Sequence, residues 1–259
     1  MSVQSFLAPI TGQTAVIDLP DAENWMQGRT LYGGASALIA YTYAIRAFTD
    51  LPPLRAAQVG FVAPVGGRVE LQAEIVRQGR SVTQLRSELY QDGALALTAF
   101  FLFAEPRKPN ALYPTRKPSD FPPPAEESED VMSDKGPNFL RNNFEIRRAQ
   151  NVSGPGEPVV RRWARLKNRE ELDPISELIL LGDVLPPGAM RAMQRQGPIS
   201  SINWSFNLLE TNPQTEDGWW VSENASQHAN NGYSSERLRL WNSEGQQVID
   251  GLQSVAIFG

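Results

Sequence analysis

Residues 232–259 read GYSSERLRLWNSEGQQVIDGLQSVAIFG, and residues 79–104 read GRSVTQLRSELYQDGALALTAFFLFA. When Gly79 is aligned with Gly232, the two stretches align at an offset of 153 residues and have apolar residues in a similar order. Both stretches alternate apolar and polar residues, as half-buried strands do. Such self-similarity is typical of a duplicated structural unit. The alternative is two unrelated runs of strands that share turn residues.

The order of predicted elements around these stretches also repeats. The Asp92-Gly93 pair lies between two apolar runs and predicts a tight hairpin turn, because Asp-Gly tolerates positive φ. In the first copy we expect a helix at 34–49 and strands at 57–63, 68–78, 81–91 and 94–104. In the second we expect strands at 143–150 and 159–167, a helix at 174–181, and strands at 199–209, 219–226, 234–241 and 247–258. A shared order of one long helix and then four strands favours duplication.

Each predicted helix has a recognisable beginning. Gly33-Gly34 opens the segment ASALIAYTYAIRAF, whose apolar residues cover most of a helix surface, so this helix is expected to be largely buried. In the second copy, Asp173 is placed to cap a helix that has Pro174 in its first position, and Glu177 completes a capping-box pattern.

The two copies are separated by a proline-rich stretch. Prolines cluster between residues 105 and 137, and this stretch also holds the acidic run 126–130 and has neither a helical nor an alternating apolar period. This composition is typical of a surface connector. We therefore divide the chain into an N-terminal repeat at 1–104, a linker at 105–138 and a C-terminal repeat at 139–259.

These patterns predict a fold of the α+β class. A sheet can bury an apolar helix on its concave face, and two such units can hide exposed strands by pairing edge to edge. We expect two tandem helix-plus-antiparallel-sheet repeats that pair into one continuous sheet wrapped around two central helices.

Charge and composition exclude several functions. The sequence has 24 Lys and Arg and 29 Asp and Glu, which gives a net charge of −5. It therefore lacks the excess of positive charge that binds the phosphate backbone of nucleic acid. The sequence has no cysteine and one histidine, His228, so we expect no thiolate or multi-histidine metal site, and no metal or cofactor. Neither a secretory signal nor a membrane span is visible, so we expect a cytoplasmic location. Catalysis would come from carboxylates, hydroxyls, amides and the backbone.

The chain resembles a known family, the double hotdog acyl-CoA thioesterases of the acyl-CoA thioesterase II type. The resemblance runs from GRTLYGG at 28–34 to QSVAIF at 253–258 and is most specific in the closing hairpin at 232–259. FVAPVG at 61–66 is similar to the family's Phe-x-x-Pro-Gly turn, with Val65 as one extra residue between proline and glycine. The resemblance implies a double hotdog fold and the hydrolysis of acyl-CoA thioesters to a free fatty or other carboxylic acid and coenzyme A.

The resemblance also implies three catalytic residues, all in the second copy. The family has an acid on the second helix, a serine or threonine that opens the next strand, and a glutamine on the last strand. These positions correspond to Asp183 in LLGDVLPP, Ser201 in SSINWSF and Gln253 in DGLQSVA. Asn203 stands where many members have aspartate, and it is expected to lie in the substrate-binding part of the site.

The residue types suit one mechanism. Asp183 follows the apolar run LILLG, where a carboxylate loses hydration and needs hydrogen-bond donors or water. With Ser201 and Gln253 it could hold a water and remove its proton as the water attacks a thioester carbon, without a covalent intermediate. The backbone N–H groups of Gly33 and Gly34 are candidates to bind the substrate's oxyanion, although the glycines could equally serve close packing.

Simpler interpretations and other functions stay open at this stage. Asp183 alone could cap a local turn. At offsets of 145 and 152 residues, Ser201 and Gln253 correspond to Ala56 and Phe101, so only one catalytic centre per chain is expected. The alternatives to hydrolysis are a non-catalytic acyl-CoA or lipid-binding protein and, with less support, a hydratase or dehydratase, which usually needs a histidine. The expected partners are acyl-CoA and further copies of the chain, because exposed sheet edges favour homo-oligomers.

Overall fold

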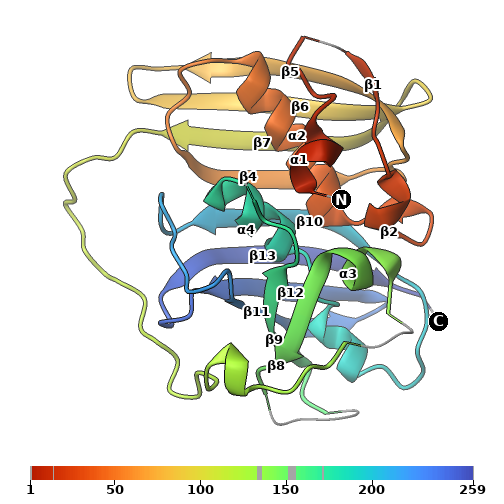
Figure 1. The fold of residues 1–259 in the computed structure, drawn as a ribbon, viewed down its shortest axis with the longest axis vertical. Coiled ribbons are helices and arrows are strands. Elements are labelled where there is room, and N and C mark those ends of the chain that lie inside the picture. Colours follow the sequence, from red (N-terminus) through yellow and green to blue (C-terminus); the bar gives the residue numbers. More distant parts are fainter. Residues whose placement is uncertain (1, 14, 133–135, 151–155, 171, 259) are drawn as a thin grey trace.

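One large antiparallel sheet organises the molecule. The computed structural model describes residues 2–13, 15–132, 136–150, 156–170 and 172–258. Within these ranges, eleven strands pair in the order β1-β5-β6-β7-β4-β10-β13-β12-β11-β9-β8. The α-helices lie on one face of this sheet, which we call the inner face (Figure 1).

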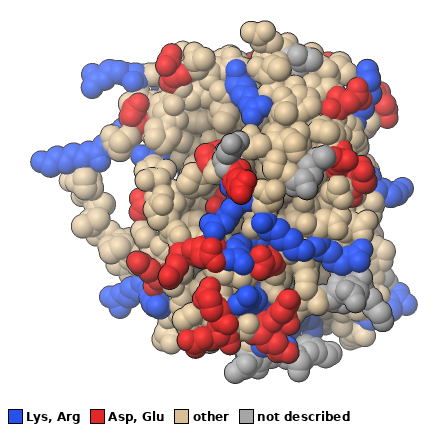
Figure 2. All heavy atoms as spheres, viewed as in Figure 1, with Lys and Arg blue, Asp and Glu red and all other residues tan. Residues whose placement is uncertain are grey.

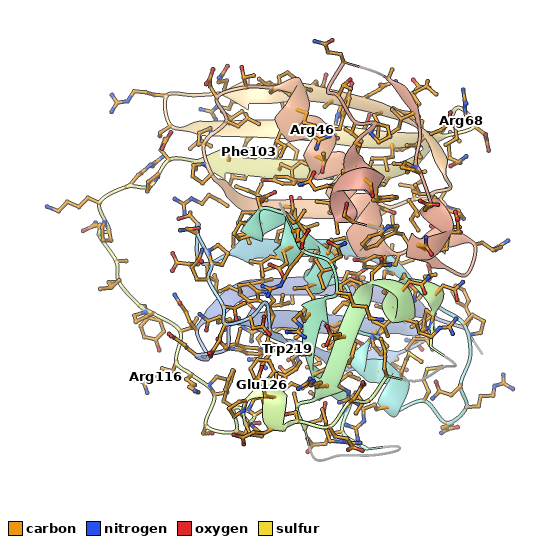
Figure 3. All side chains as sticks on the ribbon, in the orientation of Figure 1. Arg46, Arg68, Phe103, Arg116, Glu126 and Trp219 are labelled. Carbon is orange, nitrogen blue, oxygen red and sulfur yellow. The ribbon has the colours of Figure 1, made fainter. Side chains whose placement is uncertain are left out.

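The first half of the sheet surrounds helix α2 (Gly33–Ala47), and residues 34–44 of this helix are all buried. Its strands are β1 (Val16–Asp18), β4 (Leu54–Phe61), β5 (Arg68–Gln78), β6 (Val82–Gln91) and β7 (Ala94–Ala104). Asp92 and Gly93 form the β6–β7 turn with φ of 52° and 79°, as predicted. On β7, Phe103 packs between the sheet and α2, where its ring stacks on Tyr41 (Figure 3).

The second half repeats this plan around α4 (Pro174–Gly182). Its strands are β8 (Phe144–Arg148), β9 (Val159–Leu166), β10 (Ile199–Leu208), β11 (Trp220–Asn230), β12 (Tyr233–Trp241) and β13 (Gln247–Ile257). Strand β11 continues beyond the predicted end at residue 226. His228 therefore lies exposed on this strand, because the chain reverses only at Asn231-Gly232, where both φ values are positive.

The two halves join where β4 pairs with β10. Val59 is the cross-strand partner of Trp204, to which it corresponds at the offset of 145 residues, and this symmetry indicates a local two-fold relation at the seam. Helices α2 and α4 contact each other on the inner face. The predicted fold class, a double hotdog with one continuous sheet around two central helices, is confirmed.

Short elements that the sequence patterns did not predict complete the fold. They are α1 (Val3–Leu7), the 3-10 helix η1 (Ala22–Trp25), the pair β2 (Met26–Gln27) and β3 (Thr30–Leu31), η2 (Ala125–Glu127), α3 (Asn138–Asn143) and η3 (Gly188–Arg191). No described helix is long and apolar enough to span a membrane.

The capping of α4 differs in one respect from the prediction. Oδ1 of Asp173 accepts the N–H groups of Ile175 and Ser176, each over 3.0 Å, as an N-cap should. The capping-box assignment of Glu177 is wrong, because its side chain is 9% exposed and its Oε1 has no hydrogen-bond partner among the described residues. Glu177 follows the cap by four residues and not by the three that a capping box requires.

The beginning of the linker is fully exposed. Residues 105–117 are exposed throughout, including the large apolar side chains of Leu112 and Tyr113. Figure 1 shows this part standing clear of the sheet, and Arg116 points away from the body of the molecule (Figure 3).

The later part of the linker, residues 118–130, packs on the outer face of the second half. The rings of Phe121 and Trp163 meet edge to face with centroids 5.8 Å apart, and Nε1 of Trp163 donates to the carbonyl of Pro123 over 3.0 Å. Nη1 of Arg147 donates to the carbonyl of Ala125 over 2.7 Å. The linker thereby covers a second, smaller apolar cluster that includes the buried Trp241.

The two edges of the sheet differ in how much of their backbone is paired. At one edge, β1 is only three residues long. At the other, Asp130 of the linker forms a β-bridge with Arg147 of β8. Strand β1 covers only Arg68–Glu70 of β5, and the rest of β5 up to Gln78 has no strand partner on that side among the described residues. An unpaired edge favours strand pairing with another chain, and the homo-oligomer stays a prediction.

Candidate active site

Asp183 lies where the ends of the two central helices meet. It occupies the C-cap position of α4, which belongs to the second half. The backbone N–H of Gly34 at the beginning of α2 hydrogen-bonds to its carboxylate, and Nε2 of Gln253 donates to its Oδ1 over 2.7 Å. A Cβ on Gly33 would lie 2.3 Å from Oδ2 of Asp183, so a larger residue does not fit there. The surroundings of this carboxylate therefore come from both halves.

Burial determines the protonation of Asp183. Loss of hydration raises the pKa of its carboxyl to about 7, while the hydrogen bonds from Gln253 and Gly34 act in the opposite direction. Gly34 lies in the first turn of α2, where the helix dipole also favours a negative charge. A carboxylate with a pKa near 7 suits a general base at neutral pH, because it is both substantially ionised and a ready proton acceptor.

Tyr32 and Gly34 fix the approach of the two helices. The hydroxyl of Tyr32 donates to the carbonyl of Leu180 over 3.2 Å, and burial together with the charge of Asp183 raises the pKa of Tyr32 well above its usual value. A Cβ on Gly34 would come within 2.8 Å of the same carbonyl. The close-packing role of the glycine pair is thus visible, and the N–H of Gly34 is already engaged by Asp183.

Gln253 is buried on the inner face of β13, opposite Trp204 of β10. The indole of Trp204 occupies the space beside Gly182, where an added Cβ would lie 2.4 Å from the ring. The large side chain of Trp204 on the strand therefore packs against the small Gly182 on the helix. This packing places the Gln253 amide next to the end of α4.

Ser201 reaches the inner face through a β-bulge. Strict alternation from the buried Trp204 would turn Ser201 outward, but the register between β10 and β13 shifts between Ser201 and Asn203. Ser201 consequently pairs with Val255, which is fully buried, and the two side chains share the inner face with Gln253. Ser201 is half-buried and lies two pairs beyond the Gln253–Trp204 pair, with the Asn203–Ser254 pair between them, and it makes no direct hydrogen bond to Asp183.

Asn203 is not brought together with these residues. Its side chain is exposed, and its Oδ1 accepts the backbone N–H of Ser254 over 3.1 Å, which closes the bulge. Asn203 also lines a hollow of about 390 Å³ with residues of β4 and β7, including Gln58 and Phe100. A substrate-binding role for Asn203 gains no support from the geometry around Asp183.

A buried polar group that the sequence reasoning missed lies one strand further on. Glu236 of β12 is fully buried and is the cross-strand partner of Gln253. Its carboxylate accepts the N–H groups of Gly188 and Ala189 and the hydroxyl of Ser234. The available signal was alternation, since Ser234, Glu236 and Leu238 fall on one face of a predicted strand.

The corresponding part of the first half is apolar. Phe101, which matches Gln253 at the offset of 152 residues, is buried, and its ring meets that of Tyr41 with centroids 5.7 Å apart. Helix α2 carries no carboxylate. Gln253 therefore has no polar counterpart and Asp183 no acidic counterpart at the matching positions of the first half, which contributes the beginning of α2 to the site.

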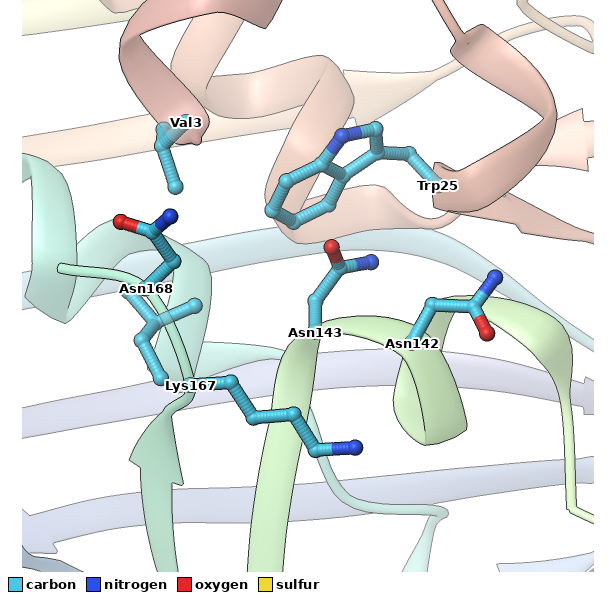
Figure 4. A pocket seen from close by; sticks show the side chains of 7 residues that line it. Val3, Trp25, Asn142, Asn143, Lys167 and Asn168 are labelled. Atoms are coloured by element: carbon cyan, nitrogen blue, oxygen red, sulfur yellow. The ribbon is translucent and has the colours of Figure 1, made fainter. Parts of the chain in front are cut away.

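Three further properties bear on ligands. Among the described residues, no group of three or more His, Cys, Asp and Glu side chains could hold a metal ion. A separate hollow of about 120 Å³ opens between Trp25 and the polar side chains of Asn142, Asn143, Lys167 and Asn168 (Figure 4). Acidic and basic side chains alternate over the lower part of the visible face without a large area of one sign (Figure 2).

Comparison with protein families decides the family. The model of the acyl-CoA thioesterase N-terminal domain matches residues 21–104, and that of the acyl-CoA thioesterase C-terminal domain matches residues 117–257. The chain belongs to the acyl-CoA thioesterase family. No curated protein matches this thioesterase family member at a significant level.

Solved structures confirm the fold of this family member. A hot dog fold protein of unknown function from Alicyclobacillus acidocaldarius is 18% identical, with a TM-score of 0.83 over 95% of this chain and 94% of that one. A candidate thioesterase II from Thermobifida fusca is 20% identical, with a TM-score of 0.78 over 94% and 92%. The acyl-CoA thioesterase II TesB2 of Mycobacterium marinum is 15% identical, with a TM-score of 0.71 over 88% and 91%.

Proposed function

We propose that this chain hydrolyses acyl-CoA thioesters, with Asp183 as general base and Ser201 and Gln253 as water-positioning groups. The observation that carries the proposal is the Asp183–Gln253 pair at the junction of α2 and α4. Membership of the acyl-CoA thioesterase family supports the substrate class.

The chemistry follows from the donors and acceptors present. Because the Gln253 amide donates to Asp183 through Nε2, its Oε1 can accept a hydrogen from a water, and the ionised Asp183 can accept the other. As that water attacks the thioester carbon, one of its protons passes to Asp183. Collapse of the tetrahedral intermediate breaks the C–S bond, and the proton passes from Asp183 to the leaving thiolate, which restores the ionised base. The products are a carboxylic acid and coenzyme A, and no bond forms between protein and substrate.

Replacing the base tests the proposal. Asp183→Asn should lower kcat by roughly 10²- to 10⁴-fold, the usual contribution of a positioned base, measured as thiol release from a panel of acyl-CoAs. Asp173→Asn at the other end of α4 is a matched control, since asparagine also caps helices, and it should retain the rate. An Asp183→Asn enzyme that is folded and fully active would refute this mechanism.

The same panel separates the alternatives. Saturable acyl-CoA binding without thiol release would indicate a non-catalytic acyl-CoA or lipid-binding protein. A hydratase or dehydratase receives no support from the histidine, since His228 is exposed on β11 while Gln253 is buried.

A further inference from the structure

The chain that follows Asp183 is held to the sheet by two buried side chains. Nδ2 of Asn224 donates to the carbonyl of Leu185 over 2.9 Å and to that of Pro186 over 3.3 Å. The carboxylate of Glu236 accepts the N–H of Gly188 over 2.8 Å and that of Ala189 over 3.2 Å. Residues 184–189, which we call the post-base segment, are therefore fixed within a few positions of the proposed base.

At Gly188 the post-base segment lies directly against the backbone of its neighbours. A Cβ added to Gly188 would meet the carbonyl oxygen of Pro158 at 2.1 Å and the backbone of Asn224 and Ser226 at 2.8 Å each. The chain can approach this closely only because position 188 is glycine. Glu236 supplies the acceptors for the N–H groups that this approach would otherwise bury without partners.

Glu236 also neighbours the other contact of the base. It is the cross-strand partner of Gln253, whose amide donates to Asp183. A hydroxyl contact from Ser234 over 2.5 Å completes the set of donors around the Glu236 carboxylate. One carboxylate thus contacts the chain leaving Asp183 and lies beside the residue that orients Asp183.

We propose that Glu236 is a positioning residue for the reaction, acting through the post-base segment and through Gln253 to hold the carboxylate of Asp183 in place. The inference rests on the proposed function. Hydrogen bonds to charged groups contribute more to stability than neutral ones, and small displacements of a catalytic group reduce rates strongly. Loss of the Glu236 contacts should therefore lower kcat more than it changes KM.

Glu223 provides a matched control in the same sheet. It is equally buried, on the adjacent strand β11, but it faces the outer side, where its carboxylate pairs with Arg161 and Arg239. Both residues are buried carboxylates with strong partners. They differ in that Glu236 faces the post-base segment and Glu223 faces the linker through Arg161 and Asp120.

The test compares Glu236→Gln with Glu223→Gln in the full chain. Glu236→Gln should lower kcat by roughly 10- to 100-fold with KM changed little, whereas Glu223→Gln should lower the melting temperature and leave kcat of the folded enzyme unchanged. Ser234→Ala, a milder change that removes one donor from Glu236, should lower kcat by a smaller factor and covers the case in which Glu236→Gln does not fold. Near-normal kcat in Ser234→Ala and in any folded Glu236→Gln, or an equal loss in Glu223→Gln, would overturn the proposal.

Asp183→Asn, measured in parallel, separates the two proposals. If Asp183→Asn is inactive while the Glu236 and Ser234 variants keep their turnover, the positioning role is wrong and the base assignment stands. If Asp183→Asn is fully active, the base assignment itself is wrong.

Discussion

The basicity of Asp183 depends on a balance between desolvation and two donors that come from different halves of the chain. Desolvation raises the pKa of its carboxyl, and the Gln253 amide and the Gly34 N–H oppose the rise. Each donor is a single group, so each can be removed by a local change. With Asp183 as the proposed base, the pH dependence of the reaction should report on this balance.

The first prediction concerns this pH dependence. If ionised Asp183 is the base, kcat/KM should increase with pH and level off above about 7, the pKa of Asp183 in the free enzyme. Gln253→Met removes a donor that lowers this pKa, so the midpoint should move to higher pH and the plateau rate should fall. Rate profiles between pH 5 and 9 measure both effects. A midpoint unchanged by Gln253→Met would show that the amide does not act on Asp183.

Single residues also show how far sequence reasoning extends into the site. Asp183 and Gln253 were chosen by resemblance, and the structure places them in contact. The face occupied by Ser201 depends on a bulge, which strict alternation does not predict. Glu236 was missed because a buried glutamate in a strand is recognisable only once its backbone partners are known.

At the scale of structural elements, the linker has two parts that differ in how they contact the rest of the protein. Residues 105–117 are exposed, while residues 118–130 include contacts to Trp163 and Arg147 on the outer face. The two halves also share the β4–β10 ladder and the α2–α4 contact. The exposed part therefore connects the halves without being needed to hold them together.

The second prediction follows from this division. Brief trypsin treatment should cut first after Arg107 or Arg116, since both lie in the exposed part. The two fragments should co-elute on gel filtration and keep the proposed thioesterase activity, because the seam and the packed part of the linker remain intact. A variant with Arg107→Gln and Arg116→Gln should resist this cut. Separate elution of the fragments would show that the seam is weak.

The long strands and both central helices could be predicted because their apolar periods are strong. The start of β5 and β7 and the end of β6 were predicted to the residue, since glycine and proline turns bound them. Elements such as α1, β1 and α3 contain only three to six residues, and they are stabilised by contacts distant in sequence. Short segments of this kind carry no periodicity that could reveal them.

For the molecule as a whole, buried acids make stability depend on pH. Burial raises the pKa of Glu177 from 4.5 to about 7, although the Trp220 indole and Arg169 act in the opposite direction. A carboxyl whose pKa is higher in the folded state stabilises that state at low pH, and the contribution is lost as the pH rises from about 4.5 through 7. Asp183 acts in the same direction, because its pKa is also raised to about 7.

The third prediction is that wild-type protein loses stability between pH 5 and 8, by roughly 3 kcal/mol through Glu177 alone. Glu177→Gln should reduce this loss and should be more stable than wild type at pH 8, because no buried charge has to form. Urea unfolding at several pH values measures the difference. Glu170→Gln, at an exposed position just before α4, should follow the wild-type curve. A parallel pH dependence in Glu177→Gln would contradict the prediction.

The meeting of Asp183 with the beginning of α2 has a consequence for how the protein behaves on dilution. The proposed base comes from one repeat and a backbone donor to it from the other, so either repeat alone would hold an incomplete site. A covalent connection keeps the two at a high effective concentration. Turnover per molecule in the intact chain should thus be independent of enzyme concentration, whereas a pair of separate repeats would lose its complete centres as they dissociate.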